Sequence, residues 1–287
     1  MTAPRVVVLG EVMLDVVAFH DAPLAVASDT PARISMRPGG AGANTAAWLA
    51  RAGVDVTLIA RVGDDAARPL ALSSMDGVDL RACVDPDLPT GTCIVLVSPG
   101  GERTMLPDPG ANTALSADEL PDDVFAQGAI LHVSGYSLMR PGSRGAALTA
   151  MDRARDAGML ISVDPASAAL LIDDPAFLHR ARPVDLLLPN QDELAALDGD
   201  LPGVKEFVVK QGRDGAYWSD GLKTIAAKAV GVDEVIDTTG AGDAFAAGFL
   251  SVWPGDREQA LEAGVTLAAQ AVAQAGGRPA SGSSPDP

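Results

Sequence analysis

The stretch that decides the fold is Asp237-Thr238-Thr239-Gly240-Ala241-Gly242-Asp243-Ala244-Phe245. Its glycines and the alanine between them open what the pattern predicts to be a helix, 242–252, and Asp243 lies in the first turn of that helix. Small residues let backbone N–H groups approach an anion, and the N-terminus of a helix adds partial positive charge. The stretch therefore predicts an anion site at the start of a helix, with a carboxylate beside it.

The position of Asp243 indicates chemistry rather than binding. A carboxylate set against a bound anion cannot help to hold it, but it can accept a proton from a nucleophile that attacks the anion. A phosphoryl-transfer enzyme needs this arrangement.

Outward from this stretch, short apolar strands alternate with alanine-rich helical segments, which predicts a parallel sheet with flanking helices. The expected strands are 5–9, 56–60, 129–134, 160–164, 184–188 and 207–210; the expected helices are 41–52, 143–157, 191–197, 242–252 and a last one from an N-cap at Asp256 to about residue 275.

Two segments, 16–38 and 84–110, break this alternation with strand-like patterns and no helical period. They predict a small antiparallel β-sheet that projects from the main domain as a lid over the site. From Gly276 onward the composition is rich in glycine, proline and serine, which favours a disordered tail.

Composition narrows the function classes. The chain has 287 residues, 47% of them hydrophobic and 21% charged, as in soluble globular proteins. It shows neither a membrane-length apolar run nor a signal peptide, so we expect a cytoplasmic protein. The net charge of −17 argues against nucleic acid as a partner, because phosphate backbones need a basic surface. ATP is compatible with that charge, since it requires only local donors and a metal.

Four further motifs each allow two interpretations. Gly39-Gly40-Ala41-Gly42-Ala43-Asn44 either makes a tight turn into a helix or lets a substrate lie close to the backbone. A dinucleotide site is disfavoured there, because the glycines follow the antiparallel segment and Thr45 replaces the third glycine. Asp15 follows the first strand, where it is either a solvated residue or an acceptor of hydrogen bonds from sugar hydroxyls.

The other two motifs lie later in the chain. Asn190-Gln191-Asp192-Glu193 is a capping box, yet Glu193 could also orient water on Mg²⁺ while Asn190 reaches a phosphate. Lys210-Gln211-Gly212-Arg213-Asp214-Gly215 is either a hairpin with an exposed lysine or a phosphate contact. The chain has neither a P-loop motif nor a His-Arg-Asp catalytic loop, which excludes P-loop NTPases and protein kinases.

Together these residues resemble the ribokinase-like, PfkB-type family of carbohydrate and nucleoside kinases. Both family signatures are present in order: Gly39 to Asn44 continuing through Gly53 and Gly63, and Asp237 through Leu250. The resemblance runs to about Pro279, which makes 1–279 one kinase domain and leaves 280–287 as the disordered tail.

The resemblance implies a three-layer α/β/α sandwich with a β-sheet lid, and transfer of the ATP γ-phosphate to a hydroxyl of a small sugar or nucleoside. It implies that Asp243 is the general base and that N–H groups of Gly240, Ala241 and Gly242 stabilise the phosphoryl oxygens. It also implies the binding residues: Asp15, Gly39, Gly40, Asn44 and Arg103 for the acceptor; Asn190, Glu193, Lys210, Gly212 and Gly215 for ATP; Glu193 for Mg²⁺ through water; and Asp237 and Thr239 for a monovalent cation such as K⁺.

Some features leave the function open. The interval from Glu193 to Lys210 is short for the family, and Ala166-Ser167 stands where ribose-type members often carry an asparagine. The substrate is therefore not predicted, and a catalytically silent sugar- or nucleotide-binding protein of the same fold is the alternative. Because the exposed edges of a lid sheet often pair, a homodimer through the lid is also expected.

Overall fold

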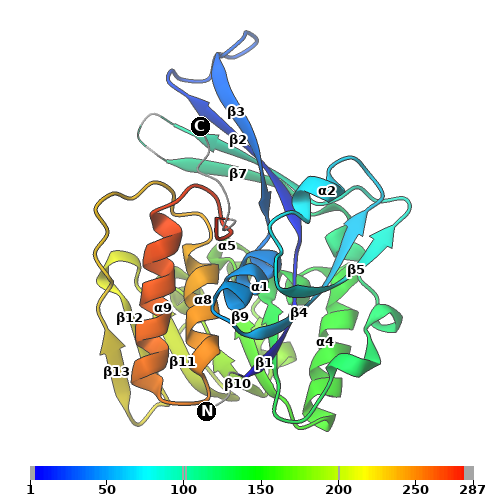
Figure 1. The fold of residues 1–287 in the computed structure, drawn as a ribbon, viewed down its shortest axis with the longest axis vertical. Helices are drawn as coiled ribbons and strands as arrows, with labels where there is room; N and C mark the ends of the chain where they lie inside the picture. Colours follow the sequence, from blue (N-terminus) through cyan, green and yellow to red (C-terminus); the bar gives the residue numbers. More distant parts are fainter. Residues whose placement is uncertain (1–3, 99, 101, 200, 281–287) are drawn as a thin grey trace.

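The computed structural model describes residues 4–98, 100, 102–199 and 201–280, which form a large sheet with helices on both faces and a small sheet that projects from it (Figure 1). Over this part of the chain, the large sheet has nine strands in the order β13-β12-β11-β10-β9-β8-β1-β4-β5. From β11 to β5 all neighbours are parallel, whereas β12 and β13 add an antiparallel edge. The strands are β1 (Arg5–Leu9), β4 (Asp55–Gly63), β5 (Val78–Asp85), β8 (Ile130–Ser134), β9 (Leu160–Asp164), β10 (Val184–Leu187), β11 (Val204–Lys210), β12 (Ala216–Ser219) and β13 (Thr224–Ala227).

Helices cover both faces of this sheet, because its parallel strands are apolar on both sides. On β1, Val6 and Val8 pack with α1, α8 and α9, while Val7 and Leu9 pack with helices on the opposite face. The expected three-layer sandwich is confirmed. The helices are α1 (Ala41–Arg51), α2 (Arg68–Ala71), α3 (Gly135–Met139), α4 (Pro141–Asp156), α5 (Ala168–Ile172), α6 (Phe177–Ala181), α7 (Gln191–Ala196), α8 (Ala241–Val252) and α9 (Arg257–Val272), with the 3₁₀ helices η1 (Gly110–Ala114), η2 (Ala117–Glu119), η3 (Asp122–Val124) and η4 (Gly212–Asp214).

Helix α8 is held against α9 by the residues that the helical period singles out. Phe245 and Phe249 stack with their ring centroids 6.4 Å apart, and both are buried. Close approach of the two helices depends on Gly264, because a Cβ at that position would lie 2.8 Å from the Phe245 ring. Asp256 caps α9 as expected, since its carboxylate accepts a hydrogen bond from Gln259 N at 2.9 Å. The start of α8 therefore sits on a firmly packed helix pair.

The small sheet is the expected lid, with two differences from the prediction. Its strands, in the order β3-β2-β6-β7, are β3 (Ala32–Gly39), β2 (Met13–His20), β6 (Thr92–Val97) and β7 (Arg103–Asp108). The lid begins earlier than expected, at Met13, so that Asp15 belongs to a lid strand. In addition, β2 and β6 are parallel to each other. The reason is that β2 follows the carboxyl end of β1 and β6 follows the carboxyl end of β5, and these two strands of the main sheet run in the same direction.

The face of the lid that points away from Asp15 is exposed to solvent. The register places Met36, Val16, Ile94 and Leu106 in one row across the four strands. Because side chains alternate between faces, this row points away from the face that carries Asp15. Met36, Ile94 and Leu106 are 59%, 45% and 52% exposed, which leaves the outer face of the lid largely apolar and uncovered.

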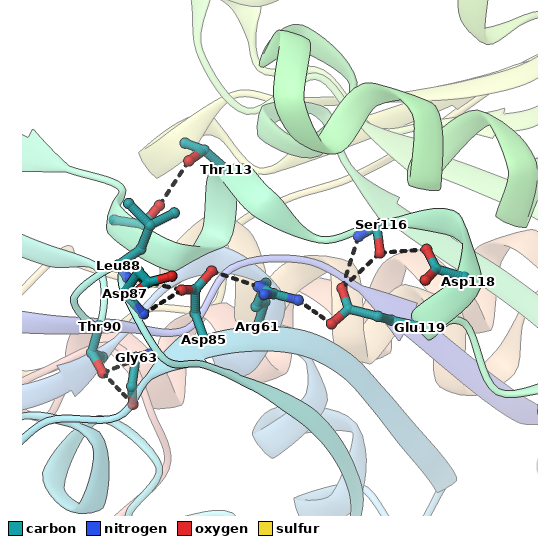
Figure 2. Close-up of polar contacts among 11 residues, drawn as sticks. Arg61, Gly63, Asp85, Asp87, Leu88, Thr90, Thr113, Ser116, Asp118 and Glu119 are labelled. Atoms are coloured by element: carbon teal, nitrogen blue, oxygen red, sulfur yellow. Dashed lines mark hydrogen bonds and ion pairs between the residues drawn. The ribbon is translucent and has the colours of Figure 1, made fainter.

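Figure 2 shows the polar network at the base of the lid, where the chain crosses from β5 to β6. Arg61 Nε donates to Asp85 Oδ2 at 2.9 Å, and Arg61 also pairs with Glu119. The second Asp85 oxygen accepts hydrogen bonds from Asp87 N and Leu88 N. These contacts fix the direction in which the crossover leaves the main sheet.

No helix in the described residues is long and apolar enough to cross a membrane. The tail prediction is wrong for Gly276–Arg278: Gly277 and Arg278 are buried and Gly276 is partly exposed, because they pack against the main sheet's helices. Residues 281–287 lie outside the described residues, so the prediction for 280–287 stays a prediction.

Candidate active site

Polar side chains from several elements meet at the carboxyl ends of the parallel strands, beside β1. The strand order reverses at β1, whose neighbours are β4 and β8, and open α/β sheets bind ligands at such a point. The groups brought together are Glu11, Asn44, Asp164, Glu193, Lys210 and Asp243.

The start of α8 requires glycine. Gly240 has a φ of 74°, and a Cβ on it would lie 2.5 Å from the Cα of Gly277. Ala241 N donates to Thr238 O at 3.3 Å, so that N–H of the expected anion site already has a partner. A Cβ on Gly242 would lie 3.6 Å from Lys210 Nζ, so the lysine ammonium group lies over the first turn of α8.

Asp243 is held by an amide. Asn44 Nδ2 donates to Asp243 Oδ2 at 2.8 Å. Burial raises the pKa of Asp243 to about 7, although the Asn44 hydrogen bond opposes this rise. The amide oxygen of Asn44, Oδ1, is buried and has no hydrogen-bond partner among the residues that the structure describes. Since buried polar atoms are nearly always hydrogen-bonded, this oxygen is available to accept from a ligand hydroxyl beside Asp243.

Lys210 lies largely buried among carboxylates, so of the two interpretations of its motif the exposed lysine is wrong. Its Nζ donates to Asp164 Oδ2 at 2.6 Å, and the two side chains are 13% and 15% exposed. Burial alone would lower the pKa of Lys210, but the charges of Asp164, Glu193 and Asp243 outweigh burial and raise it. One ammonium group therefore faces three carboxylates.

The capping box at the start of α7 forms as expected. Asn190 Oδ1 accepts from Glu193 N at 2.8 Å, and Glu193 Oε2 accepts from Asn190 N at 2.8 Å. Asn190 Nδ2 donates to the second Glu193 oxygen. Burial raises the pKa of Glu193 to about 7 against the opposing charge of Lys210. Glu193 is thus both a cap and a member of the Lys210 cluster.

The expected acceptor residues lie together where β3 meets α1. A Cβ on Gly39 would be 2.3 Å from Asp15 Oδ2, and one on Gly40, whose φ is 94°, would be 2.4 Å from Glu11 O. Glycine is therefore needed for this close approach. Burial raises the pKa of Asp15 to about 6, which Arg278 opposes and Asp237 reinforces.

Arg103 and Asp237 pair with each other. Arg103, the first residue of β7, donates through Nη2 to Asp237 Oδ1 at 2.6 Å and also donates to Thr238 Oγ1. The two Asp237 oxygens accept as well from Thr239 N at 2.8 Å and Gly276 N at 3.0 Å. This ion pair links the lid to the segment before α8.

Gly212 and Gly215 shape the turn between β11 and β12. Their φ angles are 58° and 98°, and a Cβ on Gly215 would lie 2.1 Å from Ala227 O. The turn geometry accounts for both glycines, and it places them directly after Lys210.

Three site residues were missed by reasoning from the sequence. Glu11 is 6% exposed and accepts from Ser134 Oγ at 2.7 Å and Ser137 Oγ at 2.9 Å. Asp164 ends a strand that the sequence predicted, so the rule that ligands bind beyond strand ends could have identified it. Arg278 carried no signal, since it stands in a stretch with the composition of a linker.

Comparison with known proteins gives consistent matches over most of the chain. Residues 3–283 match the family model described as pfkB family carbohydrate kinase. The ATP-dependent ribose-1-phosphate kinase of Halopiger xanaduensis is 34% identical over 78% of this chain and 76% of that protein. The fructokinase of Klebsiella pneumoniae is 33% identical over 80% of this chain and 81% of that protein.

Solved structures share the fold as well. The adenosine kinase from Sinorhizobium meliloti has a TM-score of 0.86 and 25% identity, and the match covers 96% of both chains. A putative Ribokinase II from E. coli, in complex with ATP and Mg²⁺, has a TM-score of 0.80 and 25% identity over 96% of this chain and 94% of that chain. Each match spans both the large sheet and the lid.

Proposed function

The chain belongs to the pfkB family of carbohydrate kinases, whose members phosphorylate a hydroxyl of a sugar or nucleoside, and we propose that Asp243 is its general base. The observation that carries this role is the Asn44–Asp243 pair. Asn44 fixes one carboxylate oxygen, and the unpartnered Asn44 Oδ1 provides a place for the acceptor hydroxyl next to the base. A carboxylate with a pKa of about 7 is matched to proton transfer near neutral pH.

The anion site follows from the start of α8. In this proposal, N–H groups of Gly240, Ala241 and Gly242 face the transferring phosphoryl group, with Gly242 favoured because Ala241 N already donates to Thr238 O. Lys210 lies over the same turn and supplies a positive charge. Fixed donors of this kind stabilise the charge that develops during phosphoryl transfer.

On the acceptor side, we assign Asp15, Gly39, Gly40 and Asn44 to the sugar. On the nucleotide side, Asn190, Glu193, Lys210, Gly212 and Gly215 are assigned to ATP. Mg²⁺ prefers oxygen ligands. The described residues hold no group of three or more carboxylate, histidine or cysteine side chains placed to bind a metal directly, so we assign only Glu193 to the ion, through water. Bound there through water on Glu193, it would neutralise charge on the phosphates.

The Arg103–Asp237 pair sets a condition on two other assignments. Arg103 could contact the acceptor, and Asp237 with Thr239 could hold a monovalent cation, only in a state where the pair separates. In the structure, the Arg103 guanidinium already occupies Asp237 Oδ1. A potassium ion beside Asp237 would compete with that guanidinium, so the fit to K⁺ is poor while the lid stands as it does.

The function is tested by ATP consumption against a panel of acceptors that contains ribose, ribose 1-phosphate, fructose, a phosphorylated hexose, a keto-deoxy sugar acid and adenosine. We expect transfer to at least one of them. ATP binding by calorimetry without consumption on any acceptor would instead support the catalytically silent alternative.

Glu193→Gln separates the two roles of that residue. We expect the Mg²⁺ concentration at half-maximal rate to rise at least about tenfold, because a neutral amide orients metal-bound water more weakly than a carboxylate. The measurement is the initial rate as Mg²⁺ is varied at fixed ATP. Asp192→Asn is the matched control, since Asp192 lies in the same helical turn and is exposed. Unchanged Mg²⁺ dependence with a lower melting temperature would leave only the capping role.

We further propose that the protein is a homodimer that pairs through the lid. The outer face of the lid is apolar in its central rows, and a second copy of the same face would cover Ile34, Met36, Ile94 and Leu106. Light scattering is expected to give about twice the chain mass of 29.2 kDa for the natural protein. Ile94→Glu should give a monomer, whereas Leu222→Glu, at a 98% exposed leucine outside the lid, should not. A monomeric natural protein would contradict this proposal.

A further inference from the structure

Gly276–Arg278, which come shortly after the end of α9 at Val272, lie beside the site, and we call them the C-terminal brace. Trp48 Nε1 donates to Gly277 O at 2.9 Å, which ties the brace to α1. A Cβ on Gly277 would lie 2.5 Å from Asn44 Nδ2, the atom that holds Asp243. The brace therefore touches the elements on which the proposed base depends.

Arg278 extends from the brace to the acceptor side. It is 4% exposed. Its Nη2 donates to Gly39 O at 2.8 Å, and its Nη1 donates to Ser73 O, just beyond the end of α2. Burying a guanidinium is costly, so a buried arginine whose direct partners are backbone carbonyls calls for a reason.

The reason is Asp15, which lies near both Gly39 and Arg278. Gly39 packs directly on the Asp15 carboxylate, where even a Cβ would collide with Oδ2. Asp15 is also the charged group that raises the pKa of Arg278, against the effect of burial. Arg278 thus holds the backbone of Gly39 in place and supplies a positive charge near the carboxylate assigned to the sugar.

We propose that Arg278 is a positioning residue for the acceptor site: it fixes Gly39 against Asp15 and places a positive charge near that carboxylate, so that Asp15 can accept hydrogen bonds from acceptor hydroxyls. The proposal rests on the sugar kinase function described above. Burial lowers the pKa of Arg278 only to about 10, so the arginine stays charged at neutral pH. Burial raises the pKa of Asp15 to about 6, and Arg278 limits that rise.

Loss of Arg278 should change the KM for the acceptor but not the KM for ATP. Without the guanidinium, the pKa of Asp15 rises further, and a larger fraction of Asp15 is protonated near neutral pH. The KM for the acceptor should then rise as pH falls, while the KM for ATP stays unchanged because the nucleotide residues lie on other strands. A purely structural arginine would lower stability without this pH dependence.

Arg278→Gln tests the proposal, with kcat and both KM values measured from pH 6 to pH 9. We expect the acceptor KM to increase at least about tenfold at pH 6.5 and clearly less at pH 9, with the KM for ATP within about twofold of the natural value. Arg213→Gln, at an exposed arginine on the nucleotide side, is the control and should leave the acceptor KM unchanged.

Two further measurements make the outcome decisive. Arg278→Lys keeps the charge, so it should restore most of the acceptor affinity. If the Gln protein does not fold, the acceptor KM of the Lys protein at pH 6.5 takes its place as the test. An acceptor KM about tenfold higher in the Lys protein would overturn the role of the charge. Equal changes in both KM values, or a pH-independent loss, would also overturn the proposal. A natural enzyme without transfer to any acceptor would instead refute the kinase function on which it rests.

Discussion

The Asp243→Asn enzyme is expected to turn over at least about a hundredfold more slowly than the natural enzyme, the scale on which a general base contributes. The asparagine keeps an oxygen that can accept from Asn44 Nδ2, so the geometry of the pair is retained while the proton acceptor is lost. Steady-state kinetics with the best acceptor of the panel measures the effect. Glu262→Gln, at an exposed residue of α9, is the control and should turn over normally.

The pH dependence of kcat gives a second test of the role of Asp243. Asp243 acts as a base only when ionised, and its pKa is raised to about 7, so kcat should fall as pH drops below about 7. Asp15, with a pKa of about 6, should act instead on the acceptor KM. Near-normal turnover in the Asn enzyme, or an unchanged acid limb of kcat, would exclude Asp243 as the base.

Lys210→Met is expected to destabilise the fold by about 3–5 kcal/mol, the range for removing one partner of a buried ion pair. The substitution leaves the carboxylates of Asp164, Glu193 and Asp243 without their common cation. We also expect the KM for ATP to rise at least about tenfold, because the ammonium lies over the first turn of α8. Urea denaturation followed by circular dichroism gives the free energy of unfolding.

The matched comparison is the double variant Lys210→Met with Asp164→Asn. Because it removes both charges of the 2.6 Å pair, its loss of stability should be clearly smaller than the sum of the two single losses. Additive losses would mean that the pair contributes little and that Lys210 matters through packing alone.

The sequence predicted the framework well because the framework depends on local patterns. The bounds of β1 and β9 agree with the prediction, and α8 begins one residue earlier than predicted. Apolar runs and N-caps such as Asp256 are read from neighbouring residues, so they can be recognised without the tertiary structure.

The pairings inside the site could not be predicted in the same way. Asn44 and Asp243 are 199 residues apart, and Arg103 and Asp237 are 134 apart. Such contacts depend on how strands and lid are arranged, which no local pattern specifies. Arg278 shows the same limit, since glycine-rich composition favours disorder, yet here Gly276 and Gly277 let the chain approach Asp237 and Asn44 closely enough to bury the arginine.

The placement of Asp15 within a lid strand has a consequence for control of the enzyme. The proposed sugar-binding carboxylate belongs to β2 and therefore to the lid, whereas the proposed base on α8 belongs to the main body. If the acceptor binds more tightly at one lid angle than at another, occupancy of the acceptor site and the angle of the lid are thermodynamically linked, and such linkage is reciprocal. Whatever favours one lid position, including a second copy on its outer face, changes acceptor affinity by the same factor by which the acceptor favours that position.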